Sequence, residues 1–256
     1  MIYGFIGTGT ITEALIDGLM GSRLNVQKVI VSPRNAAVAS RLAERYARVE
    51  IATGNQSVAD KADVLILAVR PQIVEEVLAA IRIPFGRKLI SVVAGISHEK
   101  LSRWTSYPES EIVRATPLPF VSYRDGVTAI FPKDETSFEF FSSVGKAVEC
   151  ESQMEFDLLA TASAMMGTYY GIMERVSDWL IAKGLDEHKA RSYLTPLFSS
   201  LAHVAENTSH TGYMQLRHEF STEGGLNEQI FKEFDENGGT SALTVALDNV
   251  LTRIRN

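Results

Sequence analysis

The segment "FIGTGTITEALIDGL" (residues 5–19) decides the fold. The segment begins at the end of an apolar run that starts at Ile2. It then passes through a glycine turn and continues with apolar residues at helical spacing. In such a strand–turn–helix unit, Gly7 permits the tight turn and Gly9 lets the backbone approach a pyrophosphate. Thr12 stands where the pattern normally has a third glycine. The position of the motif therefore predicts a dinucleotide site rather than a plain glycine turn.

Strand-like and helix-like segments alternate along the next hundred residues. We expect strands at 29–31, 64–69, 88–93, 112–114 and 127–130, and helices at 36–46 and 74–81. The segment Val64–Val69 is apolar throughout, which is typical of a parallel strand covered on both faces. This alternation predicts an α/β fold: a Rossmann-like, doubly wound parallel sheet over residues 1–152.

The end of the second expected strand indicates which dinucleotide is bound. An NAD site would carry an acidic residue there for the ribose hydroxyls. Residues 31–35 contain no acid, but they contain Ser32, a hydrogen-bond donor, and Arg34, which can pair with a phosphate. The sequence therefore favours NADP over NAD.

Residues 153–256 have the composition of an all-helical domain. The segment Phe156–Met173 is almost wholly apolar or small, and its small residues (Ala160, Ala164, Gly167, Gly171) fall near one another on a helical face. A helix that is apolar nearly all round is normally buried on all sides, which is difficult in so small a domain. We therefore expect a homodimer through this domain; a central helix in a monomeric bundle is the alternative.

Local signals place the remaining helices. Gly184 suits a helix end, Asp186 suits the next helix start, and Pro196 is expected to kink or break that helix. Shorter helices are expected after Gly212, over 226–234 and over 241–254.

Composition excludes several other classes. The chain has 256 residues, 45% hydrophobic and 22% charged, with net charge −6 and no basic cluster, so we expect no nucleic-acid partner. Cys150 is the only cysteine, and the five histidines show no metal-ligand spacing, so no metal is expected. The apolar runs are too short to cross a membrane and no basic leader precedes the first strand, so we expect a cytoplasmic protein with no membrane partner.

Several segments together resemble the pyrroline-5-carboxylate reductase family over essentially the whole chain. They are "FIGTGTITEALIDGL" (5–19), "ADVLILAVRPQ" (62–72), "LISVVAGIS" (89–97), "IVRATPLP" (112–119) and "STEGGLNEQ" (221–229). The resemblance implies an NADPH-binding domain and a helical domain that interlocks into dimers or larger rings. It also implies an active site between one subunit's nucleotide domain and its partner's helical domain, where a cyclic imine acid is reduced to proline.

The resemblance also assigns site residues. The pyrophosphate would lie at Gly7, Gly9, Thr10 and Ile11, the adenosine phosphate at Ser32 and Arg34, and the ribose near Asn55. The cofactor would be lined by Ala68, Val69, Arg70 and Pro71, and the nicotinamide would lie close to Ala94 and Gly95.

Three segments depart from the family, all around the substrate. They are residues 116–120, where Leu118 replaces an asparagine, residues 164–169, and residues 222–227. In the last of these, Asn227 stands where the family's second threonine contacts the ring nitrogen. These departures leave the identity of the substrate less well defined than the type of reaction.

The segment "STEGGLNEQ" provides the expected substrate site. Free N–H groups at a helix start attract anions, and Gly224 and Gly225 let a ligand approach the backbone closely. A substrate carboxylate could be held at Gly225, Leu226 and Asn227, with the Asn227 side-chain carbonyl accepting a hydrogen bond from a protonated imine. Glu223 could stabilise that cation, or could be an exposed acid favoured only by the helix dipole.

Two other functions remain open at this point. A β-hydroxyacid dehydrogenase would need a lysine on the interdomain helix, but residues 167–174 offer tyrosines and Glu174 instead. An NADP-binding sensor that has lost catalysis would keep the cofactor motifs and alter the substrate motifs.

Overall fold

The computed structural model describes residues 1–255, which form two compact units. The first contains Met1–Ala160 together with the end of the chain from Leu251, and the second contains Thr161–Val250. The predicted domain boundary between residues 152 and 153 stays a prediction.

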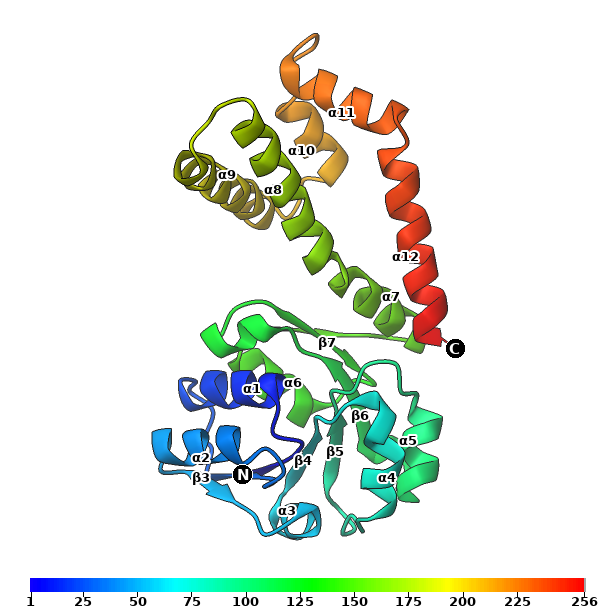
Figure 1. Cartoon of the computed structure of the whole chain (residues 1–256). Coiled ribbons are helices and arrows are strands. Elements are labelled where there is room, and N and C mark those ends of the chain that lie inside the picture. Colours follow the sequence, from blue (N-terminus) through cyan, green and yellow to red (C-terminus); the bar gives the residue numbers. More distant parts are fainter. Residues whose placement is uncertain (256) are drawn as a thin grey trace. The chain divides into compact units, whose positions relative to one another are not determined.

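An eight-stranded sheet forms the centre of the first unit (Figure 1). Its order is β3-β2-β1-β4-β5-β6-β7-β8. The strands are β1 (Ile2–Ile6), β2 (Lys28–Val31), β3 (Val49–Ile51), β4 (Val64–Leu67), β5 (Lys88–Ser91), β6 (Ile112–Thr116), β7 (Val127–Phe131) and β8 (Lys146–Glu149). The six segments expected as strands are confirmed, and the structure adds β3 and β8.

The sheet is mostly parallel, as expected, and contains one antiparallel pair. All neighbouring strands are parallel except β6 and β7, which pair antiparallel with Ala115 opposite Ile130. The connection between them holds only a 3₁₀ helix (η3, Pro119–Tyr123). An antiparallel neighbour can be reached without a crossover α-helix, whereas a parallel neighbour usually needs one.

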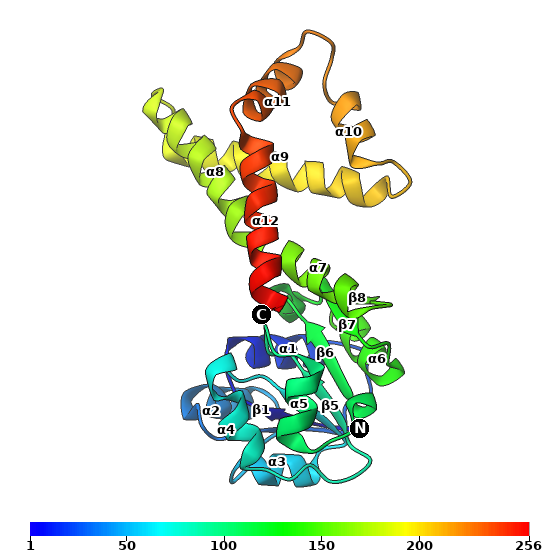
Figure 2. The same ribbon diagram turned by 90° about the vertical axis from the view of Figure 1, so that its right-hand side faces the viewer.

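Helices cover both faces of the sheet (Figure 2). Residues of α1 (Thr10–Met20), α2 (Ala36–Arg45) and α6 (Glu135–Ser143) pack into one hydrophobic cluster with the sheet. Residues of α3 (Asn55–Lys61), α4 (Val74–Ala79) and α5 (His98–Thr105) pack into a second cluster on the other face. The short 3₁₀ helices η1 (Pro71–Ile73) and η2 (Glu109–Glu111) lie in loops.

The position of β4 in the sheet explains why its sequence is apolar throughout. Val64 and Ile66 belong to the first cluster, whereas Leu65 and Leu67 belong to the second. All four residues are buried because successive side chains of a strand point to opposite faces and helices cover both.

A third glycine in the motif would let α1 pack closely against its neighbours. In this chain the close approach occurs further along α1, at Gly18. Thr12 is fully buried, and its hydroxyl donates to the Gly7 carbonyl at 2.6 Å. A Cβ atom on Gly18 would lie only 2.0 Å from the carbonyl oxygen of Val121 in η3. Gly18 is therefore the residue that lets α1 pack tightly.

The remaining helices are α7 (Gln153–Ser163), α8 (Met165–Ala182), α9 (Glu187–Asn207), α10 (Tyr213–Glu219), α11 (Leu226–Glu236) and α12 (Gly239–Arg255). The expected helix end is confirmed, because Gly184 has a φ of 94° and its N–H donates to Ile181. Asp186 caps α9 by accepting from the Lys189 N–H at 3.1 Å.

One expectation about these helices is wrong, and another is wrong in part. The apolar stretch from Phe156 is not one helix, because α7 ends before Ala164 and α8 begins after it. The sequence predicts that Pro196 kinks or breaks its helix; it does not break it, because α9 continues from Glu187 to Asn207, and the kink stays a prediction. Proline removes one hydrogen bond, but the many regular turns on either side keep the helix continuous.

Candidate functional site

The glycine turn between β1 and α1 lies where the strand order reverses. The sheet extends from β1 through β2 in one direction and through β4 in the other. Open α/β sheets bind ligands at this position, outside the carboxyl ends of the strands. Gly7 has a φ of 97°, and a Cβ there would lie 2.3 Å from the Ala68 carbonyl oxygen. Only glycine fits between the two strand ends.

The next glycine, Gly9, differs from Gly7 because it borders open space. It is the N-cap of α1, no side chain caps this helix start, and a Cβ on Gly9 would meet nothing within 4 Å. The first turn of α1, which includes Thr10 and Ile11, therefore faces open space with its N–H groups directed outward. Such a cradle fits a pyrophosphate, because the helix dipole favours negative charge there.

Buried hydroxyl groups hold the turn in place. The Gly7 N–H donates to Ser32 Oγ at 3.0 Å, and Thr8 Oγ1 donates to the Ser32 carbonyl at 2.6 Å. Ser32 is completely buried, which corrects the prediction that its hydroxyl faces a phosphate. Ser32 instead joins the end of β2 to the glycine turn. The sequence reasoning missed Thr8 in this role, although a threonine between two glycines is a visible signal.

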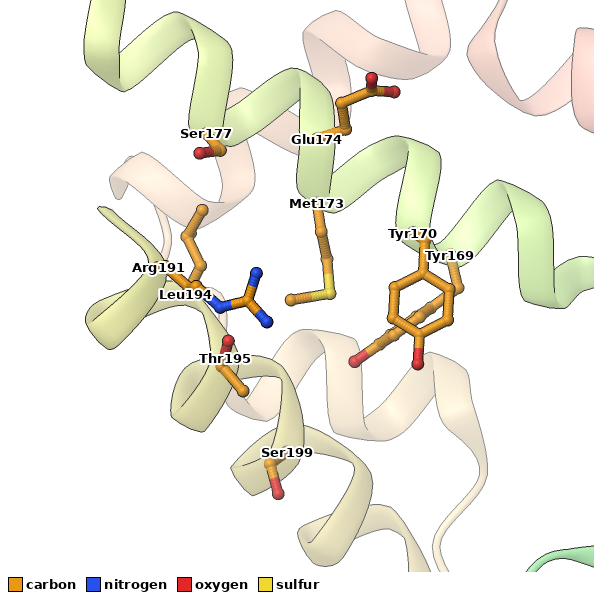
Figure 3. Close-up of a pocket in the computed structure, with 9 residues that line it drawn as sticks. All are labelled: Tyr169, Tyr170, Met173, Glu174, Ser177, Arg191, Leu194, Thr195 and Ser199. Carbon is orange, nitrogen blue, oxygen red and sulfur yellow. The ribbon is translucent and has the colours of Figure 1, made fainter. Parts of the chain in front are cut away.

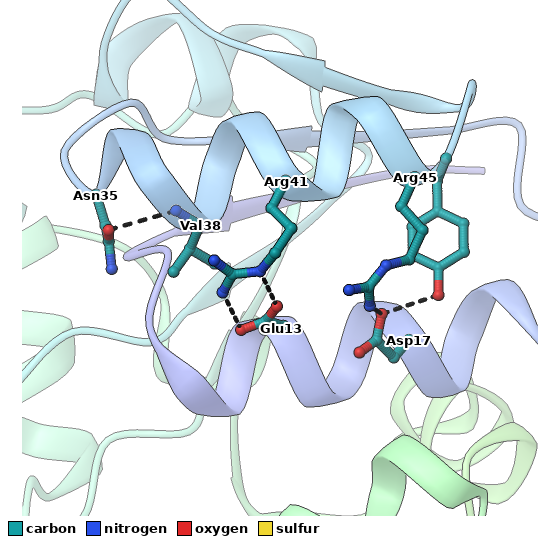
Figure 4. A network of polar contacts seen from close by, with 7 residues as sticks. Glu13, Asp17, Asn35, Val38, Arg41 and Arg45 are labelled. Atoms are coloured by element: carbon teal, nitrogen blue, oxygen red, sulfur yellow. Dashed lines mark hydrogen bonds and ion pairs between the residues drawn. The ribbon is translucent and has the colours of Figure 1, made fainter.

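Arg34 is one cation that remains available at this edge of the sheet. The nearby Arg41 forms a two-pronged pair with Glu13 at 2.9 Å, and Arg45 pairs with Asp17 at 2.9 Å (Figure 4). The hydrogen bond from Arg41 lowers the pKa of Glu13. Arg34 is exposed and has no hydrogen bond or ion pair within residues 1–255.

The other predicted cofactor residues follow neighbouring parallel strands. Ala68, Val69, Arg70 and Pro71 come directly after β4, while Ala94 and Gly95 follow β5 and are exposed. Asn55 begins α3, whose start also has no side-chain cap. Because carboxyl ends of parallel strands share one edge of the sheet, these residues lie along the same edge as the glycine turn. The structure thus places these predicted cofactor residues along one edge of the sheet, and Ser32 is buried behind the glycine turn.

The predicted substrate residues gather at the start of α11 in the second unit. Gly225 is the N-cap, and Gly224 has a φ of 69° that favours glycine. The Asn227 Nδ2 group donates to the Phe220 carbonyl at 2.7 Å. This bond fixes the orientation of the amide, and the role of its oxygen as an acceptor stays a prediction. Glu223 is exposed.

Two backbone donors at this helix start are already used. The Gly225 N–H donates to the Thr222 carbonyl at 2.8 Å, so it is not a carboxylate donor as predicted. The Gly224 N–H donates to Glu228 at 2.6 Å. The sequence reasoning missed Glu228, although an acid in the first turn of a helix is a known capping signal. The N–H groups of Leu226, Asn227 and Glu228 precede the first intrahelical bond of α11, which runs from the Gln229 N–H to the Gly225 carbonyl.

Residues 1–255 contain no group of three or more His, Cys, Asp or Glu side chains placed to hold a metal ion. Over the same residues, no helix combines the length and apolar character that crossing a membrane requires.

Comparisons with known proteins agree with the two units. Residues 2–95 match the family model "NADP oxidoreductase coenzyme F420-dependent", and residues 151–256 match "Pyrroline-5-carboxylate reductase dimerisation". A pyrroline-5-carboxylate reductase of Haemophilus influenzae is 26% identical over 98% of this chain and 96% of its own length. One from Synechocystis is 26% identical over 95% of this chain and 93% of its own length.

Solved structures show the same fold. The 1-pyrroline-5-carboxylate reductase of Streptococcus pyogenes has a TM-score of 0.86, with 22% identity over 100% of this chain and 98% of that one. A Plasmodium falciparum pyrroline carboxylate reductase with NADP bound has a TM-score of 0.83, with 19% identity over 100% and 97%. With both matched models and full-length relatives in agreement, the chain belongs to the pyrroline-5-carboxylate reductase family.

Proposed function

We propose that this protein is an NADPH-dependent reductase of a small cyclic imine carboxylate, such as pyrroline-5-carboxylate. The observation that carries the proposal is the open glycine cradle at the sheet reversal, with unpaired Arg34 beside it. The full-length similarity to pyrroline-5-carboxylate reductases supports the reaction class. A cytoplasmic location is part of the same proposal.

The cofactor cradle fits NADPH on three counts. Gly9 leaves open space, the first turn of α1 is uncapped, and Arg34 offers an unpaired guanidinium. Backbone N–H groups of α1 hold the pyrophosphate, Arg34 holds the adenosine phosphate, and exposed Ala94 and Gly95 adjoin the nicotinamide. When bound, NADPH supplies the hydride that reduces the C=N bond.

The start of α11 holds the substrate. The N–H groups of Leu226 and Asn227 bind its carboxylate, and the Asn227 amide oxygen accepts a hydrogen bond from the protonated ring nitrogen. An iminium needs little acid catalysis, so these residues act by orienting the ring. The Glu228 carboxylate already lies at this helix start and opposes a second anion, which weakens carboxylate binding.

Asn227→Ala is expected to lower kcat/KM for the imine acid by about 10- to 100-fold, because it removes a hydrogen bond to a charged group. Asn237→Ala is the matched control: its Nδ2 donates to a carbonyl at the other end of α11 at 2.6 Å, and activity should be kept. Steady-state kinetics measures both. Equal activity of Asn227→Ala and Asn237→Ala would show that Asn227 does not contact the substrate.

Unchanged turnover in Glu223→Gln would exclude a catalytic role for Glu223.

The reaction itself is tested by following NADPH oxidation with a panel of cyclic imine acids and 2-oxo acids. Turnover with an imine acid is the expected result. Tight NADPH binding without turnover of any compound would instead favour the sensor function.

We further propose that the helical unit forms a homodimer, as the matched dimerisation model suggests. Within α8 no residue is buried, and large apolar side chains are exposed: Tyr169, Tyr170, Ile172, Val176, Trp179 and Ile181. Gly167 and Gly171 have nothing within 4 Å of an added Cβ. A surface this apolar marks an interaction site in a water-dissolved protein.

A hollow between α8 and α9 supports the same proposal. It has a volume of about 480 Å³. Figure 3 shows Met173 of α8 and Arg191 of α9 extending into it, with Tyr169 and Tyr170 at one end. It contains none of the predicted cofactor or substrate residues, so a side chain of a second copy is its proposed occupant.

Val176→Asp is expected to shift the protein from dimer to monomer, because it places a charge in the apolar face of α8. Phe85→Asp is the control: Phe85 is 94% exposed in the first unit, so the dimer should persist. Size-exclusion chromatography with light scattering at micromolar concentration measures the mass. A monomeric wild-type protein would overturn the dimer.

A further inference from the structure

A second cavity in the first unit, of about 440 Å³, is lined by the start of α5, by β6 and α7, and by the last residues of α12. We propose that this cavity is a binding site for a small metabolite that presents a carboxylate or a phosphate group. Apart from Gly95 at its border, no residue of the proposed cofactor and substrate sites lines it. The inference is therefore independent of the proposed reaction.

Arg114 of β6 provides the main evidence. Arg114 is only 5% exposed, and its Nε atom is buried with no hydrogen-bond partner. The guanidinium stacks over the Phe156 ring at 4.6 Å, and its Nη1 atom stands 3.8 Å from Asp157, too far for a hydrogen bond. A buried cationic donor left without a partner is costly. An oxyanion in the cavity would satisfy it.

Asp157 forms an ion pair of 3.8 Å with Arg114 and offsets part of its positive charge. Burial lowers the pKa of Arg114 itself, as expected for a cation removed from water. Burial, and then the charge of Arg114, lower the pKa of His98 across the cavity. Asp157 meanwhile accepts a hydrogen bond from Gln153 at 2.6 Å. The field inside the cavity is therefore favourable for an anion.

Further positive groups converge on the same space. Lys100 and Arg255 line the cavity with Arg114, against the carboxylates of Glu99 and Asp157. The start of α5, capped by Ser97, adds the positive end of a helix dipole. The cavity is larger than a single inorganic anion needs, which is why we infer a metabolite that carries the anionic group.

The test is a thermal-unfolding titration of the full chain with inorganic phosphate or acetate against sodium chloride at constant ionic strength. It is done in an Arg34→Gln background, which weakens phosphate binding at the proposed cofactor site. We expect phosphate or acetate to raise Tm above the chloride curve, because a ligand that binds only the folded state stabilises it. The anion that raises Tm shows whether the site binds a phosphate or a carboxylate group.

Two variants locate the effect without replacing a buried residue. Lys100→Gln combined with Arg255→Gln should weaken the apparent anion affinity by about tenfold or more. Arg103→Gln removes an exposed charge on α5 that does not line the cavity, and should leave the affinity unchanged. A crystal soaked in selenate should show the anion beside Arg114 Nε. Curves identical to chloride, or a Tm shift that survives in the double variant, would overturn the proposal.

Discussion

Replacing Arg34 with glutamine is expected to raise the KM for NADPH by about 10- to 100-fold and to leave the KM for NADH nearly unchanged. The adenosine phosphate is the only difference between the two cofactors, and a charge-assisted hydrogen bond to phosphate has this strength. Arg34 is exposed and has no partner within residues 1–255, so no other contact is lost. Initial rates with each cofactor at saturating imine acid measure the effect.

Arg41→Gln is the matched control for this variant. Arg41 carries the same charge on the following helix, but Glu13 occupies its guanidinium through two hydrogen bonds of 2.9 Å. Its loss should leave the preference for NADPH intact. Equal changes in both variants, or an unchanged NADPH KM in Arg34→Gln, would show that Arg34 does not recognise the phosphate.

Replacing Gly7 and Gly9 with alanine is expected to separate folding from cofactor binding. Gly7→Ala forces a side chain to a φ of 97° with its Cβ 2.3 Å from the Ala68 oxygen. The unfavourable backbone conformation and the overpacking together should lower the free energy of unfolding by about 3 kcal/mol. NADPH binding should be lost as well, since the turn must move.

Gly9→Ala is expected to behave differently, because its Cβ meets nothing within 4 Å and its φ of −103° suits any residue. The free energy of unfolding should stay unchanged, whereas the dissociation constant of NADPH should rise by about tenfold or more as the methyl group enters the space for the pyrophosphate. Urea denaturation and fluorescence titration measure the two quantities. Unchanged NADPH affinity in Gly9→Ala would place the pyrophosphate elsewhere.

The two strands that the sequence reasoning missed have no continuous apolar pattern. β3 is three residues long with Glu50 at its centre, and hydrogen bonds from Lys28 and Lys61 lower the pKa of that acid to about 2. β8 begins with Lys146 and ends with Glu149 at the edge of the sheet. Both are short edge strands with few buried residues, so neither shows a run of apolar side chains long enough to be recognised.

Residue identity also does not tell which groups are already occupied. Ser32 has the right chemistry for a phosphate, but it is buried behind the glycine turn and bonded to Gly7. The Gly225 N–H is used by Thr222, and Arg34 is available because Glu13 and Asp17 engage the arginines of α2. The role of Ser32 depends on a contact between segments that are distant in the sequence, whereas the Gly225 bond is a local turn whose geometry the residue types alone do not reveal.

The sequence by itself determined the strand–turn–helix unit at residues 5–19, the apolar strand β4, the caps at Gly184 and Asp186, and the glycine-led start of α11. These features are local, because a few neighbouring residues fix the backbone through sterics, periodicity and capping. Only the tertiary structure decided the antiparallel pairing of β6 and β7, the burial of Ser32 and the unpartnered Nε atom of Arg114. Strand direction, burial and hydrogen-bond partners are set by packing between distant segments, which local pattern does not specify.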